Sequence, residues 1–420
     1  MNDHPAGKIT IGFLNRFDAR NVRSWSGTLY FMARALEQHV GNVAYLGPDK
    51  SRATRMVVNT TDRINRVSRR LSGKRLVSDM NRILAMRLAQ YFEQRIRETN
   101  CDILYAPVAS TEIAHLKTNL PIIYMSDLTW AGIVNYYPDF VNLSARERKE
   151  GERIEAAAIG KAAALIYPSE WAAQSAISHY NADSEWVYTI PFGANLEQAP
   201  SRTDALSRKL TRPLKLLWVG VDWQRKGGPI ALECLARLNE IGIDAELTVV
   251  GCAPPAEFAH PRLKVIPFLS KSIPEQRNRL SQLFLDAHFL LFPTRAEATA
   301  IVLSESSACG LPCVISDTGG VRGAIRNGVN GFLMPLAATG IDYAGKIASI
   351  VESPETYRAL VASSRDEYER CLNWDAWGRS MREVVTRVLA SRRLAGASLH
   401  EAHVSWVPST GFADPRKHET

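Results

Sequence analysis

Short apolar, β-branched segments alternate with longer helical patterns along nearly the whole chain. Strand candidates lie at residues 8–14, 42–47, 102–107, 121–126, 164–169 and 186–191, and again at 214–220, 245–251, 263–268, 288–293 and 312–317. Strands that alternate with helices in this way form parallel sheets that are covered by helices on both faces. The alternation therefore predicts an α/β fold built from doubly wound parallel sheets.

The length of the chain and one polar stretch divide this pattern into two parts. A chain of 420 residues is too long for one hydrophobic core, so two domains are expected. The polar, proline-bearing stretch 196–212 is predicted to link a first domain, 1–195, to a second domain, 213–375. A helical pattern follows at 376–395. Residues 396–420 lack periodicity, and we expect a loosely ordered tail there.

Several features of the sequence favour a cytoplasmic protein. No apolar run approaches the roughly 18 residues that a membrane-spanning helix needs. The N-terminal sequence MNDHPAGKITIGFL has no apolar run between a basic flank and a cleavage site, so it does not resemble a signal peptide. The six cysteines are scattered and form no C-x-x-C pair, so neither a zinc site nor a disulfide framework is expected.

The formal net charge is +8, and much of the excess lies at 50–75. There a single acid, Asp62, stands among these basic residues: Lys50, Arg52, Arg55, Arg63, Arg66, Arg69, Arg70, Lys74 and Arg75. An anionic membrane surface, a phosphorylated acceptor and a solvated loop with no partner all fit this charge. Nucleic acid is not expected as a partner, because the segment has no interleaved aromatic residues and no known binding motif.

The segment VGVDWQRKGG follows the strand candidate that ends at Gly220. It places Arg225 and Lys226 before two glycines and a helical pattern that starts near Pro229. Cations beside a helix N-terminus suit a diphosphate, although a solvated basic turn would have the same composition. The chain has neither G-x-G-x-x-G nor G-x-x-x-x-G-K-[ST], so dinucleotide and Walker-type phosphate loops are not indicated.

Two carboxylates flank the apolar run ATAIVLS. The preceding strand ends at Pro293, and a helix is predicted over 300–309, so Glu297 precedes the helix and Glu305 lies within it. Either these are a helix-entry charge and a surface charge, or both face a polar ligand, because carboxylates accept hydrogen bonds from sugar hydroxyls. No two aspartates stand two residues apart, so no D-x-D metal site is expected.

The motifs of the second half occur in a recognisable series. Residues 214–335 contain G-x-x-x-x-x-K-G from Gly220 to Gly227, E-x7-E at Glu297 and Glu305, ACGLPCVISDTGG and IRNGVNGFLMP. The series resembles the donor-binding half of the retaining family 4 glycosyltransferases of GT-B fold. WSGTLYFMARALE, IPFGAN and NWDAWGRSMREVVTRVL are similar to that family's first loop and helix, its hinge, and the last helix that crosses back to the first domain.

This resemblance covers roughly residues 8–392 and implies a GT-B architecture, in which two Rossmann-like domains face a central cleft. It also implies roles for single residues. Lys226, helped by Arg225, would bind the diphosphate of a nucleotide-sugar donor. Glu305 would accept hydrogen bonds from the ribose, and Glu297 would contact hydroxyls of the transferred sugar.

Backbone groups, and two departures from the family's usual residues, complete the implied site. Gly27 would let the first loop approach the donor, and the diphosphate would be lined by the backbone N–H groups of Thr299, Ala300 and Ile301. Family members usually carry an arginine where this chain has Val221, so Arg225 is expected to substitute. They commonly carry a histidine where this chain has Asp127, which could orient a sugar hydroxyl or the acceptor, or serve only as a turn residue.

The implied activity is that of a metal-independent, retaining hexosyltransferase. The sugar would pass from a UDP- or GDP-sugar to a hydroxyl of a glycan, glycolipid or small molecule, in the synthesis of cell-surface polysaccharide, lipopolysaccharide or glycolipid. No cofactor is expected. The enzyme would be cytoplasmic or peripheral at the inner face of the membrane, through residues 50–75. A nucleotide-sugar epimerase of the same fold and a catalytically silent partner subunit remain alternatives.

Overall fold

The computed structural model describes residues 8–72 and 79–404. The strands of the first half are β1 (Thr10–Phe13), β2 (Asn42–Tyr45), β3 (Ile103–Pro107), β4 (Ile122–Met125), β5 (Ala164–Tyr167) and β6 (Val187–Thr189). Those of the second half are β7 (Leu214–Val219), β8 (Ala245–Val250), β9 (Leu263–Ile266), β10 (Phe289–Phe292), β11 (Cys313–Ser316) and β12 (Gly331–Met334). Every described pairing between these strands is parallel, which confirms the predicted α/β fold.

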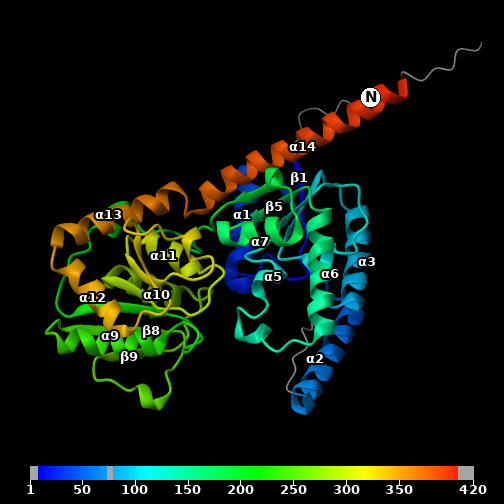
Figure 1. Ribbon diagram of the computed structural model, residues 1–420. Coiled ribbons are helices and arrows are strands. Elements are labelled where there is room, and N and C mark those ends of the chain that lie inside the picture. Colours follow the sequence, from blue (N-terminus) through cyan, green and yellow to red (C-terminus); the bar gives the residue numbers. More distant parts are fainter. Residues whose placement is uncertain (1–7, 73–78, 405–420) are drawn as a thin grey trace, which may run out of the picture.

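The strands form two six-stranded sheets, in the orders β2-β1-β3-β4-β5-β6 and β12-β11-β10-β7-β8-β9. Figure 1 shows the two α/β units side by side. The sequence did not predict β12 as a strand. It is a short edge strand that begins with a glycine after the turn-forming residues RNGVN, and its pairing with β11, from Cys313 opposite Gly331 onward, defines it.

The helices of the first half are α1 (Thr28–His39), α2 (Arg52–Ser72), α3 (Arg82–Arg97), α4 (Ser110–Ile113), α5 (Trp130–Ile133), α6 (Ala145–Lys161), α7 (Glu170–Tyr180) and α8 (Arg202–Leu206). The helices of the second half are α9 (Gly228–Glu240), α10 (Pro274–Asp286), α11 (Ile301–Ala308), α12 (Gly340–Val351), α13 (Pro354–Arg370) and α14 (Trp374–Val404). The helix predicted over 300–309 is α11, within one residue at each end.

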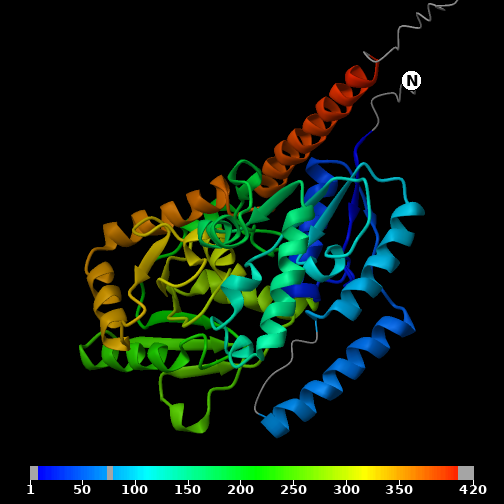
Figure 2. The ribbon, with the colours of Figure 1, turned by 45° about the vertical axis from the view of Figure 1, so that its right-hand side comes forward.

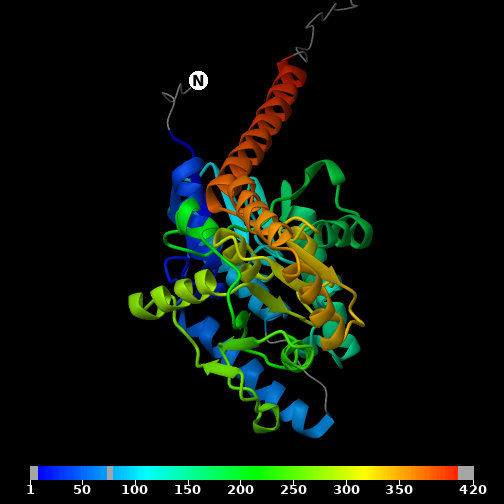
Figure 3. The same cartoon turned by 90° about the vertical axis from the view of Figure 1, so that its left-hand side faces the viewer.

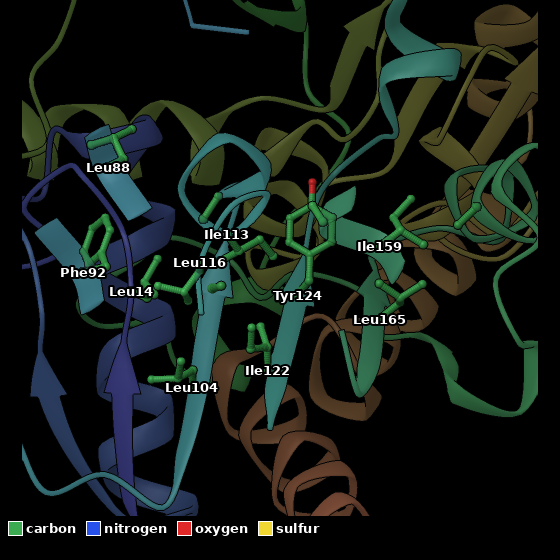
Figure 4. Close-up of a cluster of buried hydrophobic side chains, with 14 of the residues drawn as sticks. Leu14, Leu88, Phe92, Leu104, Ile113, Leu116, Ile122, Tyr124, Ile159 and Leu165 are labelled. Carbon is green, nitrogen blue, oxygen red and sulfur yellow. The ribbon is translucent and has the colours of Figure 1, made fainter. Parts of the chain in front are cut away.

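Helices cover both faces of each sheet. On one face of the first sheet, Phe92 of α3 and Ile159 of α6 share an apolar layer with Leu104 and Ile122 of the strands, as Figure 4 shows. The other face carries α1 and α14. In the second half, α9, α12 and α13 pack on one face, and α10 and α11 on the other. This packing leaves the carboxyl ends of the strands free for a site.

Helix α14 crosses back from the second half to the first, as the resemblance implied. Its residues Trp377, Met381 and Val385 share an apolar layer with Leu29 and Met32 of α1. Figures 1 and 3 show the helix running past the first sheet and beyond it.

The first part of the tail expected from residue 396 is helical in the structure. Residues 396–404 continue α14, because ASLHEA contains the helix formers alanine, leucine and glutamate. Residues 405–420, the remainder of the predicted tail, lie outside the described part of the chain.

The stretch predicted as the linker, 196–212, lies against the second half. Arg202 of α8 forms an ion pair with Asp366 of α13 at 2.7 Å. The buried Arg208 donates a hydrogen bond to the carbonyl oxygen of Cys309 at 2.9 Å. These contacts fix the stretch to the second sheet's helices, while the boundaries of linker and domains stay predictions.

Residues 52–72 of the basic segment form a helix and not the solvated loop that the sequence left open. Helix α2 packs through Val58 against the core of the first half, and Figure 2 shows it at the lower edge of the molecule. Its exposed arginines are Arg52, Arg55, Arg63, Arg66 and Arg70. Large apolar side chains are exposed beside them, by 69%, 53% and 55% respectively: Met56, Ile64 and Val67. Lys74 and Arg75 lie outside the described residues.

Candidate functional site

Two loops meet where the strand order of the second sheet reverses. Strands β7 and β10 are neighbours, although the helices that follow them, α9 and α11, cover opposite faces. Ligands of open parallel sheets bind at such a reversal, beyond the carboxyl ends of the strands. The β7 loop begins at Gly220, and the β10 loop begins at Pro293. These are the two loops that carry the predicted diphosphate and carboxylate motifs.

Lys226 of the β7 loop forms an ion pair with Glu297 of the β10 loop. Their side chains are only 13% and 7% exposed. Arg225 lies 3.6 Å from the same carboxylate and donates to the carbonyl oxygen of Ala296 at 3.0 Å. Burial lowers the pKa of Lys226, and the Glu297 carboxylate opposes this effect. The structure therefore joins three predicted residues in one buried cluster, and none of them is a solvated turn or surface charge.

Glu305 is held by a different lysine. Its side chain is 4% exposed in α11 and forms an ion pair with Lys271, which follows β9. Lys271 lines a cavity of about 140 Å³ together with Gly27 and Arg277. Gly27 has a φ of 88°, and a Cβ there would lie 3.0 Å from the carbonyl oxygen of Val22. The first loop thus lies near the partner of Glu305, while the approach of Gly27 to a donor stays a prediction.

The three predicted backbone donors lie between the two carboxylates. Ala300 is the N-cap of α11 and Ile301 its first residue, with Thr299 directly before them. N–H groups at the start of a helix have no partner within the helix and favour negative charge. An anion beside this helix end would lie between the Lys226 and Lys271 ion pairs.

Asp127 follows β4 in the first half and faces the Glu297 cluster. Burial raises the pKa of Asp127 to about 6, and the nearby Glu297 carboxylate contributes to the increase. The preceding Ser126 hydroxyl donates to the carbonyl oxygen of Leu128 at 2.7 Å. Asp127 and Glu297 therefore come from different halves of the chain and lie close enough to interact, while the correspondence of Asp127 to the family's histidine stays a prediction.

Asp127 also lines a cavity of about 580 Å³ in the first half. Part of its wall is apolar and includes Phe17, Met80, Val108, Trp130, Ile133 and Phe140. Val108 has a φ of 47°, which is strained for a β-branched residue, and such strain clusters at functional sites. The cavity combines aromatic rings with polar groups at the ends of β1, β3 and β4.

The guanidinium of Arg16 in the cavity wall is paired with two carboxylates. Arg16 forms ion pairs with Asp79 at 2.9 Å and with Glu112 at 3.6 Å. Burial raises the pKa of Glu112, and Arg16 opposes this. Two carboxylates therefore share the guanidinium of Arg16, and the exposed Arg23 is a second cation of the cavity wall.

A second buried carboxyl group lies deeper in the cavity wall. The Tyr124 hydroxyl donates to Glu155 at 3.1 Å, and Figure 4 shows this tyrosine rising from β4 with its hydroxyl beyond the apolar cluster. Burial raises the pKa of Glu155 to about 7, and hydrogen bonds from Tyr124 and Ser110 oppose this. Near neutral pH this carboxyl group can therefore both donate and accept a hydrogen bond.

The loop after α5 reaches across to the β10 loop. The Tyr136 hydroxyl accepts a hydrogen bond from the N–H of Glu297 at 2.8 Å, and the Tyr137 hydroxyl accepts from Ala298 at 2.6 Å. The Arg225 guanidinium lies over the Tyr137 ring, 5.4 Å from its centroid. The two halves are therefore in direct contact at the candidate donor loop.

The sequence did not single out the two tyrosines, Lys271, or the Arg16 and Glu155 clusters. Arg16 stands in the polar run that follows the first strand, and this position at a strand end is a signal that could have identified it. Tyr136, Tyr137 and Lys271 stand in no motif. Their roles follow from contacts between segments that are far apart in the sequence.

Two further properties concern the described residues, 8–72 and 79–404. They contain no group of three or more His, Cys, Asp and Glu side chains placed to hold a metal ion. None of the helices in these ranges is long and apolar enough to cross a membrane.

Comparisons of the sequence with known proteins identify the second half. Residues 204–367 match the family described as glycosyl transferases group 1. D-inositol 3-phosphate glycosyltransferase of Streptomyces bingchenggensis is 28% identical over 252 residues, which are 56% of this chain and 55% of that protein. The enzyme of the same name from Catenulispora acidiphila is 30% identical over 57% of this chain and 59% of its own length. The chain thus matches little more than half the length of these curated relatives.

Solved structures extend the similarity of fold to both halves. The apo form of the lipopolysaccharide outer core galactosyltransferase WaaB has a TM-score of 0.61 at 14% identity, over 90% of this chain and 99% of that one. Sucrose-phosphate synthase from Thermosynechococcus elongatus has a TM-score of 0.59 at 16% identity, over 91% and 100%. Residues 204–367 are thus similar to the group 1 glycosyl transferases, and the two sheets have the GT-B fold of these solved structures.

Proposed function

We propose that the protein is a retaining glycosyltransferase that moves a sugar from a nucleoside diphosphate to an acceptor hydroxyl. The observation that carries this proposal is the cluster of Lys226, Arg225 and Glu297, which joins two loops at the reversal point of the second sheet. Two cations suit a diphosphate, and a buried carboxylate suits sugar hydroxyls. Glu305, which lies within α11, would bind the ribose.

The proposed chemistry depends on stabilising the leaving group. The bond between the anomeric carbon and the diphosphate breaks while the acceptor oxygen bonds to that carbon on the same face, and the acceptor proton passes to a phosphate oxygen. Lys226, Arg225 and the N–H groups at the start of α11 would stabilise the charge that develops on the diphosphate. These groups need no metal ion, and we propose transfer without one. Asp127 would orient the acceptor hydroxyl or the donor sugar.

We place the acceptor in the cavity that Asp127 lines. Its aromatic wall suits the apolar face of a sugar ring, and its carboxyl groups suit hydroxyls. A phosphate would meet three carboxyl groups, those of Asp79, Glu112 and Glu155, and two arginines, of which Arg16 is already paired and Arg23 lies exposed at the cavity wall. The names of the curated relatives specify inositol 3-phosphate. For this chain we propose instead an acceptor whose bound part is an uncharged glycan or glycolipid sugar.

A donor panel followed by transfer assays tests this function. We expect one nucleoside diphosphate and its sugar conjugates to raise the melting temperature, since ligand at 100 times its Kd stabilises a protein by about 2.7 kcal/mol. Glu305→Ala should weaken this stabilisation. With the donor so identified, labelled sugar should pass to neutral sugars more readily than to their 6-phosphates.

Other outcomes of the panel select other functions. The absence of stabilisation by every nucleotide would overturn the proposal. Conversion of the donor sugar without any acceptor would indicate the epimerase, and donor binding without turnover would indicate the silent subunit. Faster transfer to the 6-phosphates would refute the assignment of the acceptor while leaving the proposed transferase activity intact.

We further propose a cytoplasmic enzyme that binds the inner face of a membrane through α2. Arg63, Arg66 and Arg70 are exposed beside exposed apolar residues on this helix, a combination that suits an anionic lipid surface. Each arginine near such a surface contributes about 1 kcal/mol. Changing all three to glutamate should therefore lower the affinity for phosphatidylglycerol vesicles by at least about 100-fold in a sedimentation assay.

The matched control applies the same change of charge elsewhere. Arg358, Arg379 and Arg382 are exposed on α13 and α14, and their replacement by glutamate should have a much smaller effect. Failure of the unmodified protein to sediment with anionic vesicles, or equal losses in the two triple variants, would contradict a role for α2.

A further inference from the structure

The contact between the two halves takes an unusual form at Tyr136 and Tyr137. Two adjacent backbone N–H groups of the β10 loop, those of Glu297 and Ala298, each donate to a tyrosine hydroxyl, at 2.8 Å and 2.6 Å. The Tyr136 hydroxyl also lies 3.0 Å from the hydroxyl of Thr318. Two uncharged hydroxyl groups therefore accept the hydrogen bonds of two backbone N–H groups in the candidate donor loop.

The surroundings are shaped to receive these side chains. At Gly319, where φ is 55°, a Cβ would lie 2.2 Å from the Tyr136 hydroxyl oxygen, so only glycine leaves room for it. The Tyr136 ring packs against Trp171, with the ring centroids 5.1 Å apart. Ala298 is 1% exposed, within the apolar cluster of the first half. The tyrosine side chains are thus closely packed against the second half and against Trp171.

The bonded groups are those that a sugar would use. Beside the two N–H groups lies the buried Glu297 carboxylate, paired with Lys226. Two hydroxyl oxygens next to one another on a sugar ring could accept from the same N–H groups and donate to that carboxylate. In the structure the two tyrosine hydroxyl oxygens accept the hydrogen bonds that the hydroxyl oxygens of such a ring would accept.

We propose that Tyr136 and Tyr137 are specificity residues of the donor site, whose hydroxyls occupy the sugar positions until a donor sugar displaces them. This inference rests on the proposed glycosyltransferase function. A sugar gains affinity only if its own oxygens replace both hydrogen bonds that the tyrosines give up. Donor sugars that lack one of these hydroxyls would leave an N–H group unpaired, and an unpaired buried group is costly.

The same segment connects the donor loop to the acceptor cavity. Trp130, Ile133 and Phe140, on either side of the tyrosines, line that cavity. The N–H of Asn135 donates to the carbonyl oxygen of Phe140 at 3.2 Å, which closes the segment into a compact loop. The tyrosines therefore lie in the same loop as residues that line the cavity in which we propose the acceptor.

The test compares two ligands that differ only in the sugar. Tyr136→Phe, Tyr137→Phe and the double variant lose the competing hydroxyls but keep the rings. For the nucleoside diphosphate found by the donor panel, the Kd should stay within about twofold of wild type in calorimetry. For its sugar conjugate, each substitution should lower the Kd by about threefold to tenfold, the size of one hydrogen bond. Tyr91→Phe, which removes a hydroxyl bonded within the first half, is the matched control.

Each outcome decides the proposal. An unchanged Kd for the sugar conjugate would overturn it, and so would an equal change for both ligands, because general opening of the cleft does not distinguish the sugar. Weaker binding of the sugar conjugate would show that the hydroxyls contact the bound sugar and do not compete with it. If the wild-type protein binds nucleoside diphosphates, the proposed donor site is supported even when the tyrosine variants contradict the specificity role. If no nucleotide binds wild type or the double variant, both proposals fall.

Discussion

Replacement of Lys226 by alanine should lower the rate constant of sugar transfer at saturating donor by about 100-fold to 1,000-fold. Removing one preorganised group that stabilises developing negative charge typically has an effect of this size. Lys226 is buried and lies at the meeting point of the β7 and β10 loops, so no solvent cation can replace it there. The release of nucleoside diphosphate and the transfer of labelled sugar measure the rate.

Lys264→Ala provides the matched control for this experiment. Lys264 also forms an ion pair with a glutamate, Glu246 at 2.6 Å, but its side chain is 61% exposed and lies on β9, outside the site. We expect its transfer rate to stay within about threefold of wild type, because exposed ion pairs contribute little. A Lys226→Ala variant that folds, binds donor and transfers sugar at nearly the wild-type rate would rule out the leaving-group role of this lysine.

Gly227→Ala should strongly destabilise the second half of the protein. Gly227 caps the N-terminus of α9 with a φ of 73°, and a Cβ there would lie 1.8 Å from the carbonyl oxygen of Pro293. The left-handed backbone costs a residue with a Cβ about 1–2 kcal/mol, and relief of the overlap adds about 1–3 kcal/mol. The melting temperature, followed by circular dichroism, should fall accordingly.

Gly242→Ala separates the two contributions. Gly242 has a similar φ of 84°, but a Cβ there would meet no atom within 4 Å. Its melting temperature should therefore fall less than that of Gly227→Ala, because only the cost of the left-handed backbone applies. Equal decreases in the melting temperature would mean that the β7 and β10 loops can move apart without cost. The close contact between Gly227 and Pro293 would then not fix the position of Lys226.

The fold was largely predictable because strand order and burial leave a strong local pattern. Buried strands such as β5 and β10 consist of continuous apolar residues between turns, and each appeared in the expected place. The edge strand β12 did not, since its four residues begin with glycine and pairing with β11 alone defines it. Helix α2 was not predicted because its many charges also suit a solvated loop, although its arginines and apolar residues recur at helical spacing.

The candidate site was predictable only where one loop carries the signal. Lys226, Glu297 and Glu305 follow strands or enter a helix, and the rules for parallel sheets place such positions at one edge. The partner of Glu305 was not predictable, because Lys271 follows another strand and stands in no motif. Tyr136 and Tyr137 come from the other half of the chain. Contacts of this kind depend on how the two halves pack, which no local pattern specifies.

The return of α14 to the first sheet has a consequence for the order in which the protein matures during synthesis. The first sheet and α1 are translated early, yet part of the apolar layer on that face is supplied by Trp377, Met381 and Val385 of α14, which emerge from the ribosome near the end. The second sheet and its covering helices, from β7 to α13, are contiguous and emerge together before α14. The part of the first half that α14 covers therefore stays exposed during synthesis until after the second half has emerged and can fold.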